Sequence, residues 1–240
     1  MKNYLLVHGA WGAAWEFDKV SELLSNEGHN VIAIDLPGHG ENKTNITDVT
    51  MNLYVQTVVD VIKELNENVI LVGHSLAGAI ISQVAEIMPE KIDRLIFIAA
   101  MLLKNGDSPL EVMQDDDEGQ LLSNTIFSED GRYATLSEET IRSILLNDIN
   151  DDAYLDSIIP KFLFNQATEP FMAKAQLSEE RFGSVEKHYI KASIDKVISP
   201  AAQEKMLSNW RVDKIVNLKS GHFPLTSMPE TLVETIKQAE

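Results

Sequence analysis

Short runs of aliphatic residues alternate with amphipathic stretches along the first hundred residues of the chain. Four runs are nearly continuous in valine, isoleucine and leucine: 4–7, 30–36, 68–72 and 92–100. Strands that are buried on both faces of a parallel sheet have this composition. The stretches between the runs place apolar residues at helical spacing, at 16–27, 51–65 and 77–88. Repetition of strand and helix predicts right-handed crossovers and a doubly wound, three-layer α/β sandwich.

This rhythm breaks after the fourth predicted strand. From about 103 to 185 the chain contains helical fragments around 138–146 and 153–163 but no clear buried strand. A stretch of this length is too long for a loop in a compact domain, so we expect it to form a cap over one edge of the sheet.

The alternation of strand and helix then returns. Strands are predicted at 188–192 and 214–218, and helices at 201–207 and from Pro229 onward. The sequence therefore predicts about six strands in a mostly parallel sheet. Residues 1–102 and 186–240 would form this core and residues 103–185 an inserted helical cap, within a single domain overall.

The charge of the chain restricts its partners. The 37 acidic and 20 basic side chains give a formal net charge of −17. Such a surface repels the phosphates of nucleic acids and of anionic lipids, so nucleic-acid binding is not expected. It also slows the approach of anionic substrates, which favours a neutral small molecule.

The chain contains no cysteine. Disulfides, thiolate catalysis and Cys-ligated zinc are therefore excluded, and a cytoplasmic location fits. The N-terminal apolar run Tyr4–Val7 is too short for the core of a signal peptide and is better explained as a first strand. No apolar run has the roughly 18 residues that a membrane helix needs, so no membrane association is expected.

Ser75 is the candidate nucleophile. It stands in the run GHSLAG (73–78), between an apolar predicted strand and a predicted helix. A serine hydroxyl attacks only when a base removes its proton, and the strand–turn–helix context of a nucleophile elbow presents it to such a base. The usual motif is GxSxG; here Ala77 replaces the second glycine, a small residue followed by Gly78, and we treat it as a tolerated variant. The alternative is that residues 73–78 form a structural turn in which Ser75 has no catalytic role.

His222 is the candidate general base. It lies in the loop SGHFP (220–224) after the last predicted strand, at the carboxyl edge of the sheet where ligands bind in such folds. The other histidines have ordinary structural interpretations: His8 and His39 in glycine-rich turns, His29 after a helix, His74 beside the serine but pointing to the opposite face, and His188 at a strand start.

The third member of a triad should be an acid between Ser75 and His222 in the chain. Asp195 follows the strand predicted at 188–192 and could reach the imidazole of His222. Its carboxylate would accept a hydrogen bond from the ring nitrogen that does not face Ser75. Asp107, after the fourth predicted strand, remains the alternative acid.

Acyl transfer places negative charge on the carbonyl oxygen, which needs two fixed donors. The backbone amide of Leu76, directly after the nucleophile, is one candidate. The glycine-rich loop HGAWG (8–12) after the first predicted strand should supply the other, and Ala10 is the candidate there.

Other chemistries find no support in the sequence. There is no HExxH motif, no Walker loop and no GxGxxG after the first predicted strand. The acidic cluster 115–118 has oxygen ligands that calcium prefers, but a charged run is usually a solvated surface. We therefore expect neither a metal nor a cofactor.

The residues around these positions resemble those of the plant methylesterase and hydroxynitrile lyase family and of related bacterial esterases, within the α/β-hydrolase superfamily. The resemblance covers the whole chain and rests on three runs in particular: HGA (8–10), 69–78 and ERFGSV (180–185). It implies the α/β-hydrolase fold, a triad of Ser75, His222 and Asp195, and oxyanion amides at Ala10 and Leu76. It also implies a small apolar pocket beneath the cap and, often, a homodimer.

Two positions depart from the lyase branch. Its members carry a threonine after the first motif histidine and a lysine after the catalytic histidine, where this chain has Gly9 and Phe223. Without that lysine the cyanide leaving group loses its charge stabilisation. We therefore predict a serine esterase that cleaves small neutral carboxylic esters, methyl or short-chain, through an acyl-enzyme. Hydroxynitrile lyase-like C–C cleavage and a ligand receptor on the same fold are the alternatives.

Overall fold

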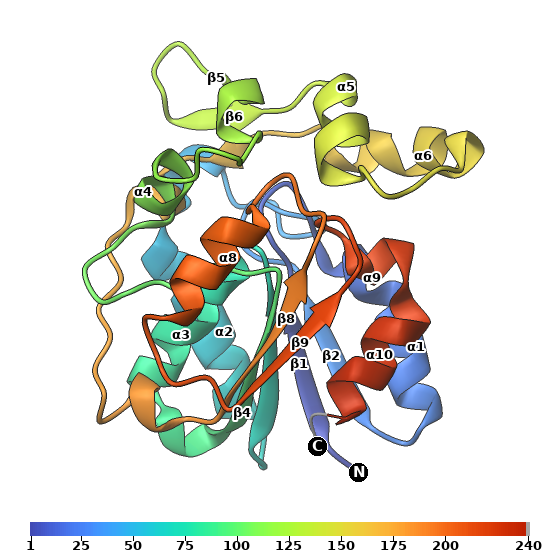
Figure 1. Cartoon of the computed structure of the whole chain (residues 1–240). Helices are drawn as coiled ribbons and strands as arrows, with labels where there is room; N and C mark the ends of the chain where they lie inside the picture. Colours follow the sequence, from blue (N-terminus) through green and yellow to red (C-terminus); the bar gives the residue numbers. More distant parts are fainter. Residues whose placement is uncertain (239–240) are drawn as a thin grey trace.

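A six-stranded sheet lies at the centre of the computed structural model, which describes residues 1–238 (Figure 1). The strand order is β2-β1-β3-β4-β8-β9, and every pairing is parallel. The bounds are β1 (Asn3–Val7), β2 (Asn30–Ile34), β3 (Val69–His74), β4 (Ile92–Ile98), β8 (Lys187–Ala192) and β9 (Lys214–Leu218). The predicted α/β fold with six strands is confirmed.

The expectation that all strands are buried on both faces is wrong for the two edge strands. β3 is buried along its whole length, whereas β2 has no buried residue within 30–34 and β9 has one within 214–218, Leu218. An edge strand has a sheet neighbour on one side only, so its residues reach solvent more readily than those of the central strands.

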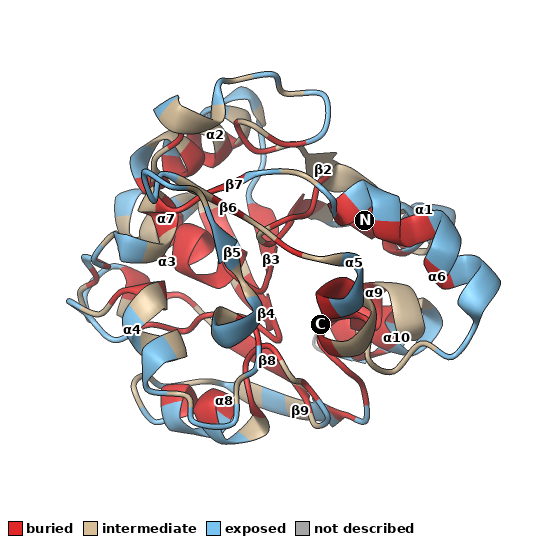
Figure 2. Ribbon diagram, turned by 90° about the horizontal axis from the view of Figure 1, so that it is seen from above, coloured by how far each residue is buried: buried red, intermediate tan, exposed pale blue. Residues whose placement is uncertain are grey.

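Helices cover both faces of the sheet (Figure 1). One face carries α1 (Asp18–Asn26) and α10 (Pro229–Gln238), and the other carries α2 (Met51–Glu64), α3 (Ala77–Ile87) and α8 (Pro200–Leu207). Side-chain caps start two of them: Thr50 accepts from the amide of Leu53 at 3.1 Å, and Ser199 accepts from that of Ala202 at 3.0 Å. Figure 2 shows the buried residues on the inner sides of these helices and along the central strands.

The segment between β4 and β8 lies over the carboxyl edge of the sheet (Figures 1 and 2). Its elements are α4 (Pro109–Gln114), β5 (Ile126–Phe127), β6 (Tyr133–Thr135), α5 (Glu138–Thr140), α6 (Asp152–Ile158), β7 (Gln166–Ala167) and α7 (Glu169–Met172). The predicted fragments 138–146 and 153–163 correspond to α5, which continues as a π-helical turn, and to α6.

A small antiparallel sheet in this segment, in the order β5-β6-β7, was not expected from the sequence. The absence of a buried strand is therefore wrong for β7, whose two residues are both buried. Strands of two or three residues are too short to produce a periodic pattern, so only their pairing in the folded chain defines them.

Candidate active site

Ser75 occupies a strained turn between β3 and α3. Its φ angle is +55°, in the left-handed region that side chains other than glycine rarely adopt. Its carbonyl oxygen accepts hydrogen bonds from the amides of Met101, at 2.9 Å, and Gly78, at 3.1 Å. Such strain persists only where the surroundings hold it, and it is common at functional sites. The turn therefore has the geometry of a nucleophile elbow.

Close packing explains why this turn tolerates Ala77. A Cβ atom at Gly73 would lie 2.9 Å from the Cδ1 atom of Ile81, and one at Gly78 would lie 2.5 Å from the carbonyl oxygen of Met101. Ala77 is fully buried as the first residue of α3, with its methyl group accommodated. Position 77, where the usual motif has glycine, therefore has room for a methyl group. The next position, Gly78, does not, because the backbone of Met101 lies against it.

Ser75, His222 and Asp195 form a continuous chain of hydrogen bonds. His222 Nε2 lies 2.8 Å from Ser75 Oγ, and His222 Nδ1 lies 2.8 Å from Asp195 Oδ2. All three residues are buried. Because an ionised carboxylate can only accept, Nδ1 carries the proton and Nε2 is left to accept the serine hydroxyl. The structure thus brings together the three residues that the sequence singled out.

Backbone donors fix the carboxylate of Asp195. Its Oδ1 atom accepts from the amides of Val197, at 2.7 Å, and Ile198, at 3.1 Å. The side-chain amide of Gln203 lies 3.3 Å from Oδ2. With these partners the carboxylate has little freedom to rotate away from His222.

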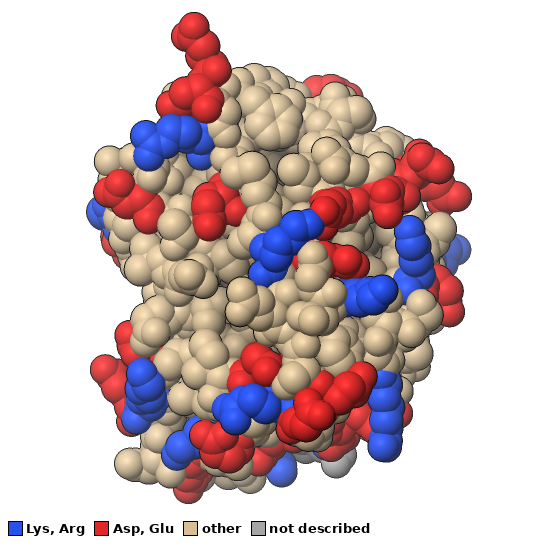
Figure 3. Space-filling model, turned by 90° about the vertical axis from the view of Figure 1, so that its left-hand side faces the viewer, with Lys and Arg blue, Asp and Glu red and all other residues tan. Residues whose placement is uncertain are grey.

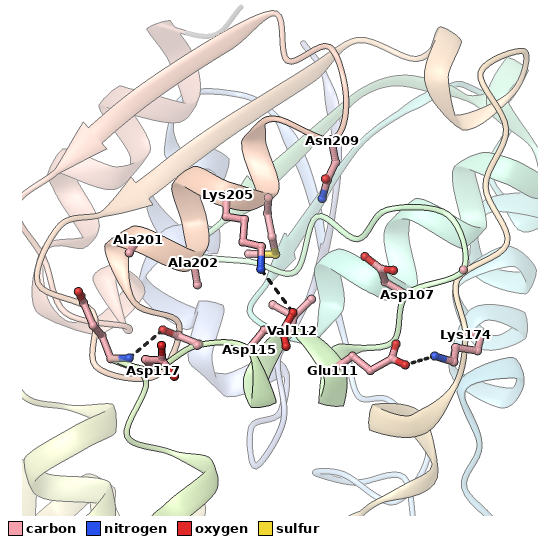
Figure 4. Close-up of a pocket in the computed structure, with 14 residues that line it drawn as sticks. Asp107, Glu111, Val112, Asp115, Asp117, Lys174, Ala201, Ala202, Lys205 and Asn209 are labelled. Carbon is pink, nitrogen blue, oxygen red and sulfur yellow. Dashed lines mark hydrogen bonds and ion pairs between the residues drawn. The ribbon is translucent and has the colours of Figure 1, made fainter.

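Asp107, the alternative acid, lies in a different pocket. Figure 4 shows it in an open pocket of about 550 Å³ together with Glu111 of α4 and Lys205 of α8. None of Ser75, His222 and Asp195 lines this pocket. Lysines neutralise part of its acidic lining, since Lys174 pairs with Glu111 and Lys205 lies 3.4 Å from Asp115.

The described part of the chain contains no group of three or more His, Cys, Asp or Glu side chains that could hold a metal ion. Among the same residues, no helix combines the length and apolarity that crossing a membrane requires.

The two candidate oxyanion residues, Ala10 and Leu76, line one cavity with Ser75 and His222. Within residues 1–238 neither of their backbone amides donates a hydrogen bond to a protein acceptor. Two free donors beside a buried serine hydroxyl are the arrangement that the oxyanion of acyl transfer requires.

Two buried histidines hold the loop of Ala10, residues 8–12. His8 Nδ1 donates to the carbonyl oxygen of Gly9 at 2.7 Å, while its Nε2 accepts from the amide of Leu36 at 3.1 Å. His39 Nδ1 lies 2.8 Å from the carbonyl oxygen of Gly12, to which it can only donate. Both side chains are buried, so a surface role is wrong for them, whereas their bonds to the turn backbone agree with the structural role expected in these turns.

Gln166 of β7 extends this network to the segment above the sheet. Its side-chain oxygen accepts from the amide of Trp11 at 3.1 Å, and its side-chain nitrogen lies 3.3 Å from Tyr54 Oη. The same hydroxyl lies 2.8 Å from His39 Nε2, to which it donates. Trp11 has a φ angle of +53°, so the network holds a strained loop residue next to Ala10. The run FNQA (164–167) resembles the cap of the related family, but sequence reasoning gave Gln166 no role in the site.

Burial keeps these loop histidines neutral. It lowers the pKa of His8 well below its usual value, with the nearby His39 acting in the same direction. Burial also lowers the pKa of His39 to about 4, against a smaller opposing effect of its hydrogen bond to Gly12. Both therefore act as neutral anchors at pH 7.

The cavity at Ser75 is small and apolar. Its volume is about 20 Å³, room for a single water molecule. An outer apolar pocket of about 320 Å³ lies beside it, and the two share the side chains of Trp11, Met113 and Phe171. Phe127 and Met172 also line the outer pocket, and each is about half exposed.

The fold and this serine elbow define an α/β-type hydrolase, and comparison with known proteins agrees. A sequence model described as the alpha/beta hydrolase family matches residues 4–235, and the chain belongs to that family. The α/β-hydrolase superfamily predicted from the motifs is thereby confirmed.

Named relatives narrow this placement to the methylesterase and hydroxynitrile lyase branch. A putative chloroplastic methylesterase 11 from Arabidopsis thaliana is 33% identical over 96% of this chain, which spans 62% of that relative's length. An alpha-hydroxynitrile lyase from the same plant is 31% identical over 98% of this chain and 95% of its own.

A solved structure supports the same placement. A pyrethroid hydrolase from Sphingobium faniae JZ-2 is 28% identical, with a TM-score of 0.85 over 99% of this chain and 96% of its own. At the level of the family, relatives named as esterases agree with the predicted enzyme class, a carboxylic ester hydrolase.

Proposed function

We propose that this protein hydrolyses carboxylic esters with Ser75 as the nucleophile. His222 Nε2 takes the hydroxyl proton while Oγ bonds to the ester carbonyl carbon, and the imidazolium then donates that proton to the departing alkoxide. Asp195 holds His222 in the required tautomer and stabilises the imidazolium. A water molecule, activated by the same imidazole, releases the acyl group as a carboxylic acid and restores Ser75.

The amides of Ala10 and Leu76 bind the oxyanion in both steps. Each donor of this kind typically contributes about 3–4 kcal/mol of transition-state stabilisation. Their fixed directions depend on the elbow at Ser75 and on the anchored loop 8–12. The loop therefore belongs to the proposed machinery even though its histidines do not touch the substrate.

One observation carries this proposal above the others. The bonds from Ser75 to His222 and from His222 to Asp195 are both 2.8 Å long, and Ser75 and His222 line a cavity together with Ala10 and Leu76, whose amides have no protein acceptor among residues 1–238. A structural turn needs neither the aligned imidazole nor the free amides.

The two pockets support a neutral ester with one small group. The cavity of about 20 Å³ at Ser75 fits a methyl or similarly short group, and the apolar outer pocket can take the remainder of the ester. The net charge of −17 disfavours anionic substrates. On the face drawn in Figure 3, Lys and Arg side chains lie among Asp and Glu side chains without forming a basic patch.

Hydroxynitrile lyase chemistry is the second candidate, because one relative of this chain carries that name. The residue after His222 is Phe223, which is buried against the rings of His74 and Phe162. It offers no cation to a cyanide leaving group. Ester hydrolysis is therefore the function that the site supports better.

A panel of neutral p-nitrophenyl and methyl esters, varied in acyl length and with aryl methyl esters and lactones included, tests the proposal. We expect hydrolysis of short esters by the wild type and its loss in Ser75→Ala. Retained hydrolysis in Ser75→Ala would overturn the assignment. Cyanide release from mandelonitrile above the background rate would favour the lyase instead, and tight ligand binding with very slow turnover would favour a receptor.

A further inference from the structure

A second acid–histidine pair lies buried next to the proposed triad. The side chains of Glu16 and His74 are both fully inaccessible to solvent, and Glu16 Oε2 lies 3.6 Å from His74 Nδ1. Neither carboxyl oxygen of Glu16 nor His74 Nδ1 has a hydrogen-bond partner among the described residues. Buried polar atoms are almost always paired, so the unpaired Glu16 Oε2 and His74 Nδ1, which lie 3.6 Å apart, call for an explanation.

His74 is connected to the catalytic loop by its other nitrogen. His74 Nε2 lies 2.8 Å from the carbonyl oxygen of His222, and the two rings are 4.8 Å apart. A carbonyl oxygen only accepts, so Nε2 carries the proton of this bond. In a neutral ring Nδ1 then has a lone pair, and it needs a donor.

A protonated carboxyl group of Glu16 can supply that donor. Burial raises the pKa of Glu16 well above its usual value, with the nearby Gly9 amide opposing the shift. Burial lowers the pKa of His74, and the neighbouring His222 and His8 act in the same direction. Both directions favour a neutral acid beside a neutral imidazole over an ion pair.

The carboxyl group of Glu16 is connected to two loops, the loop 8–12, which carries Ala10, and the loop 220–224, which carries His222. A Cβ atom at Gly12 would lie 1.7 Å from Glu16 Oε1, so the carboxyl group packs directly on the backbone of the loop that carries Ala10. Through His74 the same carboxyl group faces the main chain of His222. Small movements of this pair would therefore reach both the proposed oxyanion donor and the proposed base.

We propose that Glu16 is a positioning residue, a neutral carboxylic acid that donates its proton to His74 Nδ1 and thereby fixes the Nε2–H tautomer that holds the carbonyl of His222. The 3.6 Å between the two atoms exceeds hydrogen-bond distance by a few tenths of an ångström, so the proposed bond requires a small rotation of one of the two side chains. The neutral state also matters, because a charged His74 would oppose the positive charge that develops on His222 during acyl transfer. This inference rests on the proposed esterase function.

Two substitutions at Glu16 separate positioning from packing. Glu16→Gln keeps a donor that can reach His74 Nδ1, whereas Glu16→Met fills a similar volume without one. We expect kcat for a short p-nitrophenyl ester to stay within about threefold in Glu16→Gln and to fall roughly 10- to 100-fold in Glu16→Met, with KM nearly unchanged. The pH profile of Glu16→Gln should match that of the wild type, because the pair does not ionise.

Thermal unfolding of both variants accompanies the kinetics. Glu16→Met keeps the side-chain volume but leaves the buried His74 Nδ1 without a donor, so we expect it to remain folded with a lowered thermal unfolding midpoint while it loses rate. Equal kcat values in all three proteins would overturn the proposal, as would an equal loss in Glu16→Gln and Glu16→Met.

A measurement on the wild-type protein does not depend on activity or on any variant's folding. The ¹⁵N shifts of His74, assigned by comparison with His74→Gln, should show a neutral ring protonated at Nε2 between pH 6 and 8. A ring protonated at Nδ1, or at both nitrogens, would overturn the inference. Failure of the esterase proposal would instead appear as absent hydrolysis in the wild type, with the tautomer unchanged.

Discussion

Asp195 and His222 are 27 residues apart in the chain, yet their side chains meet at 2.8 Å. β8 and β9 are adjacent and parallel, with Ala192 opposite Leu218 at their carboxyl ends. Each of the two residues follows its strand by three or four positions, so the sheet places both at the same edge. The pairing of the acid and the base is therefore a consequence of strand register.

Asp195→Asn should reduce kcat by about 10⁴-fold while the protein stays folded. An amide at this position favours the wrong tautomer of His222, which then cannot accept the proton of Ser75. Steady-state hydrolysis of a short p-nitrophenyl ester measures the effect. Asp107→Asn is the matched control and should leave kcat within about twofold. A comparable loss in the Asp107 variant would reopen the choice of acid.

Gln166→Met should lower kcat about 10-fold and the free energy of unfolding by about 1–3 kcal/mol. The substitution leaves the amide of Trp11 buried without an acceptor and loosens the loop of Ala10. Urea denaturation measures the free energy of unfolding, and steady-state ester hydrolysis measures kcat. Gln56→Met, at an exposed position of α2, serves as the control, and an unchanged rate in Gln166→Met would show that the loop needs no anchor from β7.

Ala77→Gly, which restores the usual motif, should leave kcat within about twofold and cost about 1 kcal/mol of stability. Glycine lowers helix propensity at the start of α3 and removes a buried methyl group. Gly78→Ala should cost about 3 kcal/mol or more, since its methyl group would meet the backbone of Met101. Urea denaturation midpoints measure the loss of stability in both variants. A small loss in Gly78→Ala together with a large loss in Ala77→Gly would contradict this account of the turn.

The free energy of unfolding should fall as the pH drops from about 6.5 toward 4. His39 has a pKa of about 4 in the folded chain, against an ordinary value of 6.5. The unfolded chain therefore binds more protons in this window, and stability present above pH 6.5 is lost on acidification. The contribution of His39 is about 3 kcal/mol. Urea denaturation of the wild type and of His39→Asn at several pH values isolates it, and parallel pH curves would refute it.

Phe171→Ala should raise kcat/KM for esters with a bulky group several-fold relative to short esters. The ring of Phe171 lies 5.9 Å from that of Trp11, between the cavity at Ser75 and the outer pocket. Removal of this ring would join the cavity at Ser75 to the outer pocket. Competition between a short and a bulky ester measures the ratio, with Phe127→Ala at the outer pocket alone as the control. A ratio that changes equally in both variants would show that Phe171 is no barrier.

Local patterns along the chain were sufficient to predict the α/β fold and the candidate triad. Aliphatic runs of four to nine residues indicate buried strands, and helical spacing indicates the crossovers. In a parallel sheet the loops that follow the strands share one edge, so Ser75, His222 and either Asp195 or Asp107 could be placed at that edge from their order, whereas only the structure places Asp195 beside His222. The edge strands and the small sheet β5-β6-β7 escaped this reasoning, because exposure at an edge and pairing of very short strands depend on neighbours in space.

Only the tertiary structure decided which groups support the site. Gln166 lies 155 residues from the Trp11 amide that it binds, and His74 lies 148 residues from the His222 carbonyl. No periodicity or motif connects such positions. The buried carboxyl group of Glu16 and the small cavity at Ser75 likewise arise from packing between segments far apart in the chain. The sequence by itself determined the sheet and the order of its catalytic candidates, whereas the fold determined their tautomers, their anchors and the space around them, because these depend on contacts that form only when the loops meet.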